Sequence, residues 1–587
     1  MRIQTIQEGF TAGSVTPLIH GRMSSDIYNE SVALMNNMIS TSHGPAIRRP
    51  GTRNIVQLKR QVTEDNNILL ENGTDTLYLE DGSGSYLTEA AGVVKNPIIP
   101  FAAGTPYFHT TLHISPSFAT MYDKNGVINI SAADIEFSNP WASKDLDLLA
   151  WVQLPGINPR LIIVHPDVAP YELKWTGTTF TLTLITFTVP PWTTPIWPEA
   201  VGYYEGRLIF GSSKTQPERS WLSKVNDHYN FTAGSGAADS FSFDLDKPGK
   251  IKWIEGLDTL LLGTGSGIWD ITPFSNTSLL GPGNYKAKRR NSFAAYSFYH
   301  YVDDTGVIYI AQEGKRVYSI RPGTQLDKDY KSDEPSFTGR HLLENKINNI
   351  SGVQYPHSIV FMPRNGGVIG MTHSPEKLPY SGWHHHTTLG TIYDMYSIFD
   401  NGEYLTFVTI NYEGIVYLLR LDWDYPLDSN KLVTPSPASA ILTGLSHLEG
   451  ESVYVWANNK SYGPHTVVSG QITISEATST AVVGLGFSSK IITRRLSKSS
   501  PFGPDQGLIK RWNKIGVRVG IGQRPKLNGS RPANAEPNDP SVDYNSTEDV
   551  MVSNMGFSKF GHVTIEEDTA APLMVAALFG QVSSETV

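Results

Sequence analysis

The stretch IKWIEGLDTLLLGTGSGIWDI, residues 251–271, sets two apolar runs on either side of the glycine-rich turn at residues 263–267. A second stretch, EYLTFVTINYEGIVYLLRLD (residues 403–422), repeats this pattern around residues 411–414. Short alternating runs joined by tight turns predict β-hairpins. Roughly six such units lie between residues 147 and 424. Their spacing predicts a β-propeller, whose blades span about 40–50 residues, and leaves a pair of β-sandwiches as the alternative.

Outside this region the composition changes. The segment VPPWTTPIWP (residues 189–198) holds four prolines, which predicts a rigid connector rather than a central strand. Residues 440–522 carry further apolar runs typical of a separate sandwich-like module, and the polar residues 524–546 predict a long exposed loop. We therefore expect an N-terminal arm and helix (1–60) in a platform, a propeller-like tube domain (61–435), and a C-terminal β platform module (436–587).

One helix is predicted near the start of the chain. Tyr28, Val32, Met35 and Ile39 recur at spacings of four, three and four, which places them on one helical face. A Gly-Pro pair at residues 44–45 would end this helix. The helix would then lie between an extended arm and the basic turn RRPGTR at residues 48–53, where Pro-Gly predicts a turn.

The composition excludes several classes of protein. The 587 residues include 52 Gly and 37 Pro but no Cys, which excludes a thiolate nucleophile, disulfides and every metal centre that needs Cys. The formal net charge of −9 disfavours a protein that grips nucleic-acid phosphates tightly. The chain has no run of 18 apolar residues, and its first ten residues lack the apolar core of a signal peptide. We therefore expect a soluble, non-secreted, mainly β protein.

Three motifs raise the question of chemistry. The run Trp383-His384-His385-His386 would place two imidazoles on one face of a strand, but nothing identifies further metal ligands. The glycines at residues 263–267 precede a strand, which favours a tight turn over a nucleotide-binding loop. The basic run KAKRRN (residues 286–291) is interpreted as a solvated loop or an interface with an acidic neighbour. We expect no metal, no cofactor and no enzymatic activity.

Short phrases in a fixed order carry a resemblance to a known family. The N-terminal ones are supplied by Phe10, Gly13, Pro17, Gly21, Arg22, Asp26, Tyr28, Asn36, Arg48, Arg49, Pro50, Gly51 and Thr52. Further phrases are GRLIFGSS (206–213), LLLGTGSGIW (260–269), SGWHHHTTLG (381–390) and ILTGLSHLEG (441–450). Together they resemble the tail nozzle (tail tubular protein B-like) family of short-tailed double-stranded-DNA bacteriophages.

The resemblance implies a structural virion protein at the tail tip, assembled in the host cytoplasm. Its copies would form a ring, six-fold in known relatives, beneath the portal–adaptor (head-to-tail connector) proteins, with tail fibres or tailspikes as further partners. Such a ring extends the portal–adaptor channel, helps retain the packaged genome and conducts DNA during ejection, without membrane insertion by this chain. Six copies at −9 each carry −54, and an acidic lumen would repel the phosphates of passing DNA.

The resemblance also suggests which residues matter. The platform or assembly candidates are Arg22, Asp26, Tyr28, Arg48, Arg49, Pro50, Gly51 and Thr52. The interface candidates, at a structural corner, are Trp383, His384 and His386. Arginines of the turn at residues 48–53 would bridge neighbouring carboxylates, so Arg49→Ala is expected to weaken ring assembly.

Two other classes of function stay open. A carbohydrate-recognising propeller of a phage tail, used for receptor binding, would show rows of exposed aromatic side chains. A glycan-degrading enzyme would need two carboxylates facing one another across a cleft. Neither class accounts for the ordered phrases.

Overall fold

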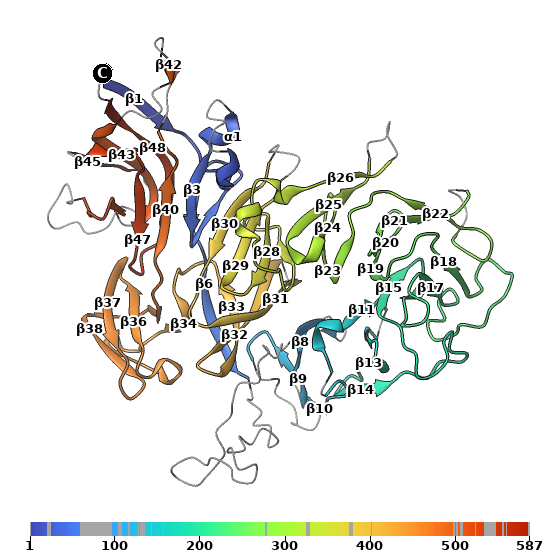
Figure 1. The fold of residues 1–587 in the computed structure, drawn as a ribbon. Coiled ribbons are helices and arrows are strands. Elements are labelled where there is room, and N and C mark those ends of the chain that lie inside the picture. The colour runs from blue at the N-terminus through green and yellow to red at the C-terminus, as the bar shows by residue number, and fades with distance from the viewer. Residues whose placement is uncertain are drawn as a thin grey trace, which may run out of the picture.

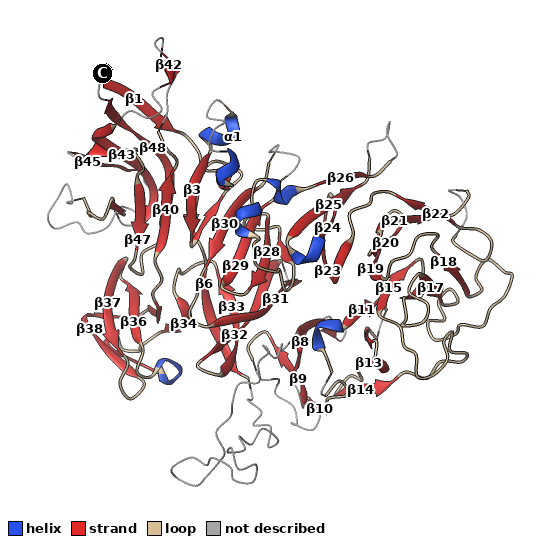
Figure 2. Ribbon diagram, in the orientation of Figure 1, coloured by secondary structure: helices blue, strands red, loops and turns tan. Residues whose placement is uncertain are grey.

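The computed structural model is built almost entirely of β-strands, with one short α-helix and a few 3₁₀ turns (Figure 1, Figure 2). It describes residues 2–19, 25–58, 97–103, 108–115, 118–126, 128, 135–142, 144–156, 158–275, 279–323, 329–374, 380–400, 402–496, 499–500, 503–504, 509–522, 524–532, 548–553, 557–558 and 560–584. The α-helix is α1 (Asp26–Asn29), and the 3₁₀ turns are Pro17–Ile19, Leu146–Leu148, Gln312–Gly314, Pro335–Phe337, Arg340–Leu342 and Ser446–Leu448.

Seven antiparallel units of four strands each follow one another among the described residues, built from positions 98–422 with β6 (Gly51–Gln57) as the last strand of the seventh unit. We number them as blades 1–7. Blade 1 consists of β7 (Ile98–Ala103), β8 (Phe108–Ile114), β9 (Phe118–Asp123) and β10 (Glu136–Ser138). Blade 2 consists of β11 (Ala150–Leu154), β12 (Arg160–His165), β13 (Val168–Trp175) and β14 (Phe180–Leu184). Blade 3 consists of β15 (Ala200–Tyr204), β16 (Arg207–Gly211), β17 (Arg219–Leu222) and β18 (Phe241–Asp244).

Blades 4 to 7 continue the same pattern. Blade 4 consists of β19 (Ile251–Gly256), β20 (Leu260–Thr264), β21 (Gly267–Thr272) and β22 (Lys286–Arg289), and blade 5 of β23 (Ala295–Asp303), β24 (Gly306–Ala311), β25 (Arg316–Arg321) and β26 (Lys331–Asp333). Blade 6 consists of β27 (Ser351–Val353), β28 (Ile359–Arg364), β29 (Gly367–Thr372) and β30 (Gly382–His386). Blade 7 consists of β31 (Thr391–Asp400), β32 (Glu403–Tyr412), β33 (Ile415–Asp422) and β6 (Gly51–Gln57). Tight hairpins join β20 to β21 and β32 to β33, as the two quoted stretches predicted.

The blades close into a ring, because each pair of neighbouring blades shares a buried apolar cluster. The closing cluster joins blade 7 to blade 1 and contains Ile98, Tyr122, Phe407 and Leu418. This cyclic order identifies residues 98–422, together with β6, as a seven-bladed β-propeller. The alternative of two β-sandwiches is wrong for this part of the chain.

The centre of the ring is filled by aromatic side chains. Between Ala295 and His300 the register of β23 shifts, so the strand bulges where Phe298 and Tyr299 lie. The ring of Trp151, on β11 in blade 2, lies 4.9 Å from that of Phe298 and 5.6 Å from that of Tyr299. Blades 2 and 5 stand on opposite sides of the axis, so these contacts close the axis of a single propeller at this level.

The remaining strands form a platform at one end of the molecule (Figure 1). They are β1 (Arg2–Gln7), β2 (Gly13–Ser14), β3 (Ser31–Asn36), β4 (Met38–Ser40), β5 (Ala46–Arg48), β34 (Asp428–Val433), β35 (Ser439–Thr443), β36 (Ser452–Ala457), β37 (Lys460–Thr466), β38 (Gln471–Thr478), β39 (Ala481–Leu485), β40 (Ser489–Thr493), β41 (Ser499–Ser500), β42 (Gly503–Pro504), β43 (Lys510–Gly522), β44 (Lys526–Leu527), β45 (Glu548–Ser553), β46 (Phe557–Ser558), β47 (Thr564–Glu567) and β48 (Leu573–Ser584). Two of its sheets enclose a shared apolar core, as in a β-sandwich.

Two sheets run without interruption from the propeller into the platform. Blade 6 continues from β30 through β2 and β3 to β40, β47 and β44. Blade 7 continues from β6 through β34 to β39, β36 and β37. The expected boundary at residues 435–436 therefore lies inside a continuous structure, and residues 51–57 belong to the propeller rather than to the N-terminal arm alone.

The long N-terminal helix predicted from the apolar spacing is wrong. Of the described residues in this segment, only 26–29 are α-helical, and β3 and β4 follow. The register of β3 against β40 shifts between Val32 and Leu34, and this bulge buries both Val32 and Met35, three residues apart, in the same core. Asn37, with a φ of 52°, then turns the chain between the two strands. A bulge and a turn thus imitate helical spacing.

Parts of two predicted segments lie outside the described residues. They are residues 61–96 of the expected tube domain and residues 533–546 of the expected loop. At the described start of that loop, β44 pairs with β47.

Candidate functional site: the joint between propeller and platform, and the groove beside it

Arg49 forms the centre of the joint between the propeller and the platform. Its guanidinium binds Asp428 through two parallel hydrogen bonds, with N–O distances of 2.9 and 2.6 Å. The remaining N–H groups donate to Asn37 Oδ1 and to the carbonyls of Pro50 and Thr387. Because Arg49 is only 4% exposed, this is a buried, fully hydrogen-bonded ion pair. The carboxylate that pairs with Arg49 is therefore that of Asp428, in the same chain.

Arg48 points into the platform and contacts no carboxylate directly. Its Nε donates to Ser489 Oγ, and its other N–H groups donate to the carbonyls of Thr569, Ala571 and Phe487. Burial lowers the pKa of the Arg48 guanidinium to about 10. Both Arg48 and Arg49 lie over the ring of Phe487, at 4.6 and 3.6 Å from its centroid.

The turn after the two arginines is tightly constrained. Gly51 donates its N–H to the carbonyl of Tyr425, and a Cβ at this position would lie 2.0 Å from the carbonyl oxygen of Leu427. Thr52 contacts Asp428 and accepts a hydrogen bond from the N–H of Ser429. The run at residues 48–52 is thus an internal joint between modules rather than a surface turn.

Asn37 is a joint residue that the sequence did not reveal. Its side-chain amide donates to Thr387 Oγ1 and to the carbonyl of Ser488, while its Oδ1 accepts from Arg49 and from the N–H of Thr387. One side chain therefore connects the residue before β40, the segment after β30, and the arginine turn. The Asn-rich stretch at residues 36–37 was the available signal, but two of the partners of Asn37, Thr387 and Ser488, are more than 300 residues away.

The N-terminal candidates contact the other side of the platform. The hydroxyl of Tyr28 donates to the carbonyl of Arg495 at 2.9 Å, and Arg494 lies 5.3 Å from the Tyr28 ring. Burial raises the pKa of the Tyr28 phenol. Asp26 begins α1 and faces an open groove. Arg22 lies outside the described residues.

Trp383, His384 and His386 are all buried in β30. Trp383 is packed, as expected for a structural corner, and the interface role of the two histidines stays a prediction. The indole of Trp383 packs in the core between blades 5 and 6. The rings of His384 and His386 stack at 4.7 Å, and Nδ1 of His384 lies 2.7 Å from Nε2 of His386. β30 is an inner strand because β2 and β3 extend the sheet past it, and the two rings pack against Gly370, Thr372 and Phe361 of the same blade.

This histidine pair predicts acid sensitivity. Burial lowers the pKa of His384 to about 3, and it holds the pKa of His386 well below its usual value. An unfolded histidine takes up a proton near pH 6.5, while the folded pair stays neutral. The contribution of the pair to the free energy of unfolding is therefore fully present above pH 6.5 and is lost as the pH falls towards 3. Each proton contributes a slope of up to about 1.4 kcal/mol per pH unit.

The measurement is the midpoint of urea unfolding at pH values from 7.5 to 4. The loss of stability with falling pH should be less steep in His384→Gln than in the parent protein. The exposed His43 supplies the control, because His43→Gln should leave the slope unchanged. An identical slope in all three proteins would contradict a role for the buried pair.

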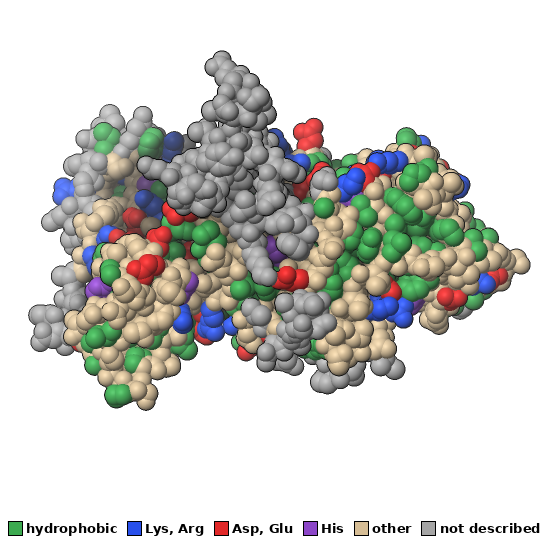
Figure 3. Space-filling model, turned by 90° about the horizontal axis from the view of Figure 1, so that it is seen from below, with side chains coloured by type: hydrophobic (Ala, Val, Ile, Leu, Met, Phe, Trp, Pro, Cys, Tyr) green, Lys and Arg blue, Asp and Glu red, His purple; other side chains and the backbone are tan. Residues whose placement is uncertain are grey.

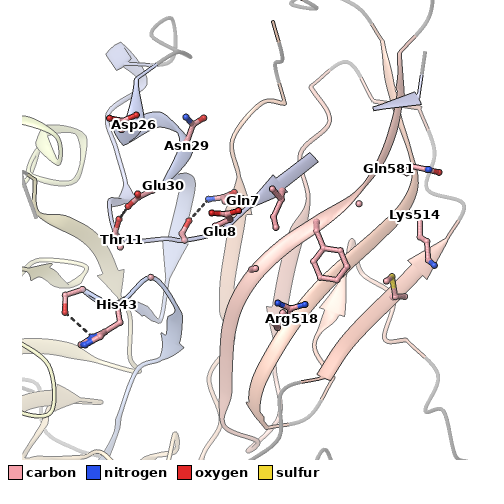
Figure 4. Close-up of a pocket in the computed structure, with 18 residues that line it drawn as sticks. Gln7, Glu8, Thr11, Asp26, Asn29, Glu30, His43, Lys514, Arg518 and Gln581 are labelled. Carbon is pink, nitrogen blue, oxygen red and sulfur yellow. Dashed lines mark hydrogen bonds between the residues drawn. The ribbon is translucent and has the colours of Figure 1, made fainter. Parts of the chain in front are cut away.

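An open groove lies beside α1 and separates it from the C-terminal sheet (Figure 4). Its volume is about 1440 Å³. Asp26 and Glu30 come from the α1 side, while Lys514 and Arg518 come from β43 on the opposite side. The Glu30 carboxylate accepts hydrogen bonds from Thr11 and Tyr380, which fixes the acidic wall.

The groove floor and rim add apolar surface. Ile6 is 58% exposed and Met551 is 42% exposed, and Phe579 lines the groove between them. The groove therefore offers opposite charges on its two walls and apolar contacts between them. Such a lining suits a segment of polypeptide better than a small ligand.

The other sequence motifs have structural roles. The first four residues of the basic run form β22, where Lys288 pairs with Asp329. Arg290, directly after this strand, binds the buried Asp270. The glycine-rich run forms the tight turn between β20 and β21. No group of three or more His, Asp or Glu residues in the described part of the chain could hold a metal ion. None of the described helices is long and apolar enough to cross a membrane.

Comparisons with known proteins give little beyond the fold. No protein-family model matches the chain, and no curated protein matches it. Among solved structures, the chain is similar to the N-terminal domain of Nup159, with a TM-score of 0.33 and 8% sequence identity. The alignment covers 66% of this chain and 99% of that one. The closed order of the seven blades, rather than this distant likeness, identifies the propeller.

Proposed function

We propose that the chain is a structural virion protein, a subunit of a tail nozzle ring that extends the portal–adaptor channel, helps retain the packaged genome and conducts DNA during ejection. The observation that carries the proposal is the role of the RRPGT phrase. In this chain it forms the buried joint that fixes the propeller to the platform. The residues on which the resemblance rests thus hold the propeller and the platform in a fixed arrangement. A subunit of a structural ring needs such a fixed arrangement.

The filled propeller axis supports a channel made by several copies. Aromatic contacts between blades 2 and 5 close the axis of one subunit, so DNA would pass between subunits arranged in a ring. Six copies would each bring a formal charge of −9, and an acidic lumen would favour sliding over binding. The mechanism is geometric and electrostatic, and it involves no covalent chemistry, metal or cofactor.

The proposed partners are other copies of the chain, the portal–adaptor proteins, and tail fibres or tailspikes, at the tail tip of a virion assembled in the host cytoplasm. The groove beside α1 is the candidate surface for the adaptor or a neighbouring subunit, because its charged walls and apolar rim suit a peptide segment. The chain itself would not enter a membrane.

A carbohydrate-recognising propeller used in receptor binding is the weaker candidate. Such a protein would present aromatic rings to solvent for stacking on sugars. None of the 12 tryptophans, all of them in the described residues, appears among the large hydrophobic side chains that are strongly exposed. Five other aromatic side chains are exposed, but no two of them belong to the same blade, so they form no row along one blade; they are Phe108, Phe274, Phe337, Tyr355 and Phe399. The absence of such a row among the described residues favours a scaffold.

Mass measurements test the proposal directly. The purified protein, mixed with portal–adaptor complexes, should form a ring of about six copies on them, as measured by mass photometry. Lys514→Glu reverses the charge of one groove wall and should reduce this docking at least tenfold. Lys286→Glu, the same change on the exposed β22, is the matched control and should dock normally. A protein that ignores the complexes and binds glycans would overturn the nozzle assignment.

A further inference from the structure

The outer strand of blade 2 differs from every other open blade edge in the described structure. Five blades end in a strand that no further strand covers: β10, β14, β18, β22 and β26. Four of these strands carry charged residues, which discourage pairing with another chain. The fifth, β14, has the sequence Phe-Thr-Leu-Thr-Leu and carries no charge, proline or register shift.

The segment of sequence around β14 is equally free of charge, although the ion-paired Glu172 and Lys174 of β13 lie opposite Thr183 and Thr181. Residues 175–198 contain no Asp, Glu, Lys, Arg or His in 24 positions. Leu184 is 55% exposed and Val189 is 45% exposed. In the view from below, hydrophobic side chains gather over the propeller half of the molecule (Figure 3). β14 runs along the lower margin of this half in Figure 1, so an apolar surface adjoins the open edge.

The backbone of β14 is arranged to accept another strand. Ile185 donates its N–H to Pro170 on the β13 side, so the alternation of an antiparallel ladder directs the backbone groups of Phe180, Leu182 and Leu184 outward. Phe180 and Leu182 join the core between blades 1 and 2, while Thr181 and Thr183 lie on the opposite face.

This edge is complementary to itself. An antiparallel pair of β14 strands centred on Leu182 would place Leu182 opposite Leu182 and Phe180 opposite Leu184. Thr181 would face Thr183 on the other side of the sheet, a favourable cross-strand pair. All outward-facing backbone groups would be hydrogen-bonded, and no charged side chain of β14 itself would be buried. The same pairing of two β22 strands would bring lysines and arginines together.

We propose that β14 is a docking edge for a second copy of this chain, with the two blades joined across a two-fold axis into one eight-stranded sheet. The chain already uses strand addition to extend blades 6 and 7, where β2 and β34 continue the sheets. Because this contact is two-fold and lies on β14 rather than in the groove, it is distinct from the proposed ring contacts and can fail independently of them.

Sedimentation equilibrium of the full chain tests the proposal. The parent protein should show a monomer–dimer equilibrium at micromolar concentrations. Leu184→Lys places a charge on the edge and should weaken dimerisation at least tenfold, with an unchanged melting temperature. Ser242→Lys, at an exposed position of the outer strand of blade 3, is the matched control and should dimerise like the parent protein. A monomeric parent protein, or a Leu184→Lys variant that dimerises normally, would overturn the proposal.

A cross-linking experiment gives an independent readout, since the parent chain contains no cysteine. The double variant Thr181→Cys/Thr183→Cys should form a dimer band on a non-reducing gel after mild oxidation, and the band should disappear on reduction. Ser242→Cys should remain monomeric under the same conditions. Equal cross-linking of both variants, or of neither, would contradict pairing through β14.

Discussion

Arg49→Ala is expected to lower the free energy of unfolding by about 3–5 kcal/mol, because it leaves the buried carboxylate of Asp428 without its counter-ion. The substitution also removes the hydrogen bonds to Asn37 and Thr387, and with them the contact between the segment after β30 and the arginine turn. The measurement is urea unfolding at pH 7.5, followed by tryptophan fluorescence. Any loss of ring assembly would then follow from loss of the joint.

The matched control is Arg219→Ala. Arg219 also forms two hydrogen bonds with a carboxylate, that of Asp244, but this pair is largely exposed. Exposed pairs contribute about 0–1 kcal/mol, so the two arginines should differ clearly. The double variant Arg49→Ala/Asp428→Ala should lose less than the sum of the two single variants, because no unpaired charge remains. Simple additivity would contradict a coupled buried pair.

Trp383→Ala is expected to destabilise the protein by about 3–5 kcal/mol through the cavity left in the core between blades 5 and 6. The indole is fully buried, and Gly339 lies so close to it that a Cβ there would be 2.2 Å from the ring. The surrounding strands are held by their sheets, so little collapse into the cavity is expected. The thermal midpoint and the urea midpoint should both fall.

Trp383→Phe separates packing from hydrogen bonding. The indole Nε1 of Trp383 has no hydrogen-bond partner in the structure, so phenylalanine loses volume but no polar contact. Its destabilisation should be well below that of the alanine variant. Equal losses for the two variants would show that the site depends on something other than filled volume.

The sequence predicted the strands of the propeller well because their signals are local. Alternating apolar residues and tight turns specify a hairpin such as that at residues 411–414 without help from the rest of the chain. The number of blades is not local. The outer strand of blade 7 is β6, which pairs with Leu418 and Leu419 from more than 300 residues earlier in the chain. The roughly six hairpin units counted between residues 147 and 424 correspond to blades 2–7, while blade 1 (residues 98–138) and the strand β6 lie outside the stretch that was counted.

The joint could be predicted only in part. The RRPGT phrase identified residues that matter, but the partner of Arg49 is 379 residues away, and no spacing rule points to Asp428. The helix prediction failed for a related reason. A bulge in β3 reproduces helical spacing, and only the pairing with β40 shows that the segment is a strand. The place of the histidines in an inner strand likewise depends on β2 and β3, which extend the sheet past β30.

The position of β6 between β33 and β34 has a consequence for how the protein is made. The N-terminal strand emerges from the ribosome first but can enter its sheet only after residues 415–433 have been synthesised. The last strand, β48, in turn lies between β43 and the early strands β1 and β5. Closure of the propeller within one chain is therefore a late event that depends on long-range strand pairing. This makes folding slow and leaves incomplete chains with unpaired strand edges.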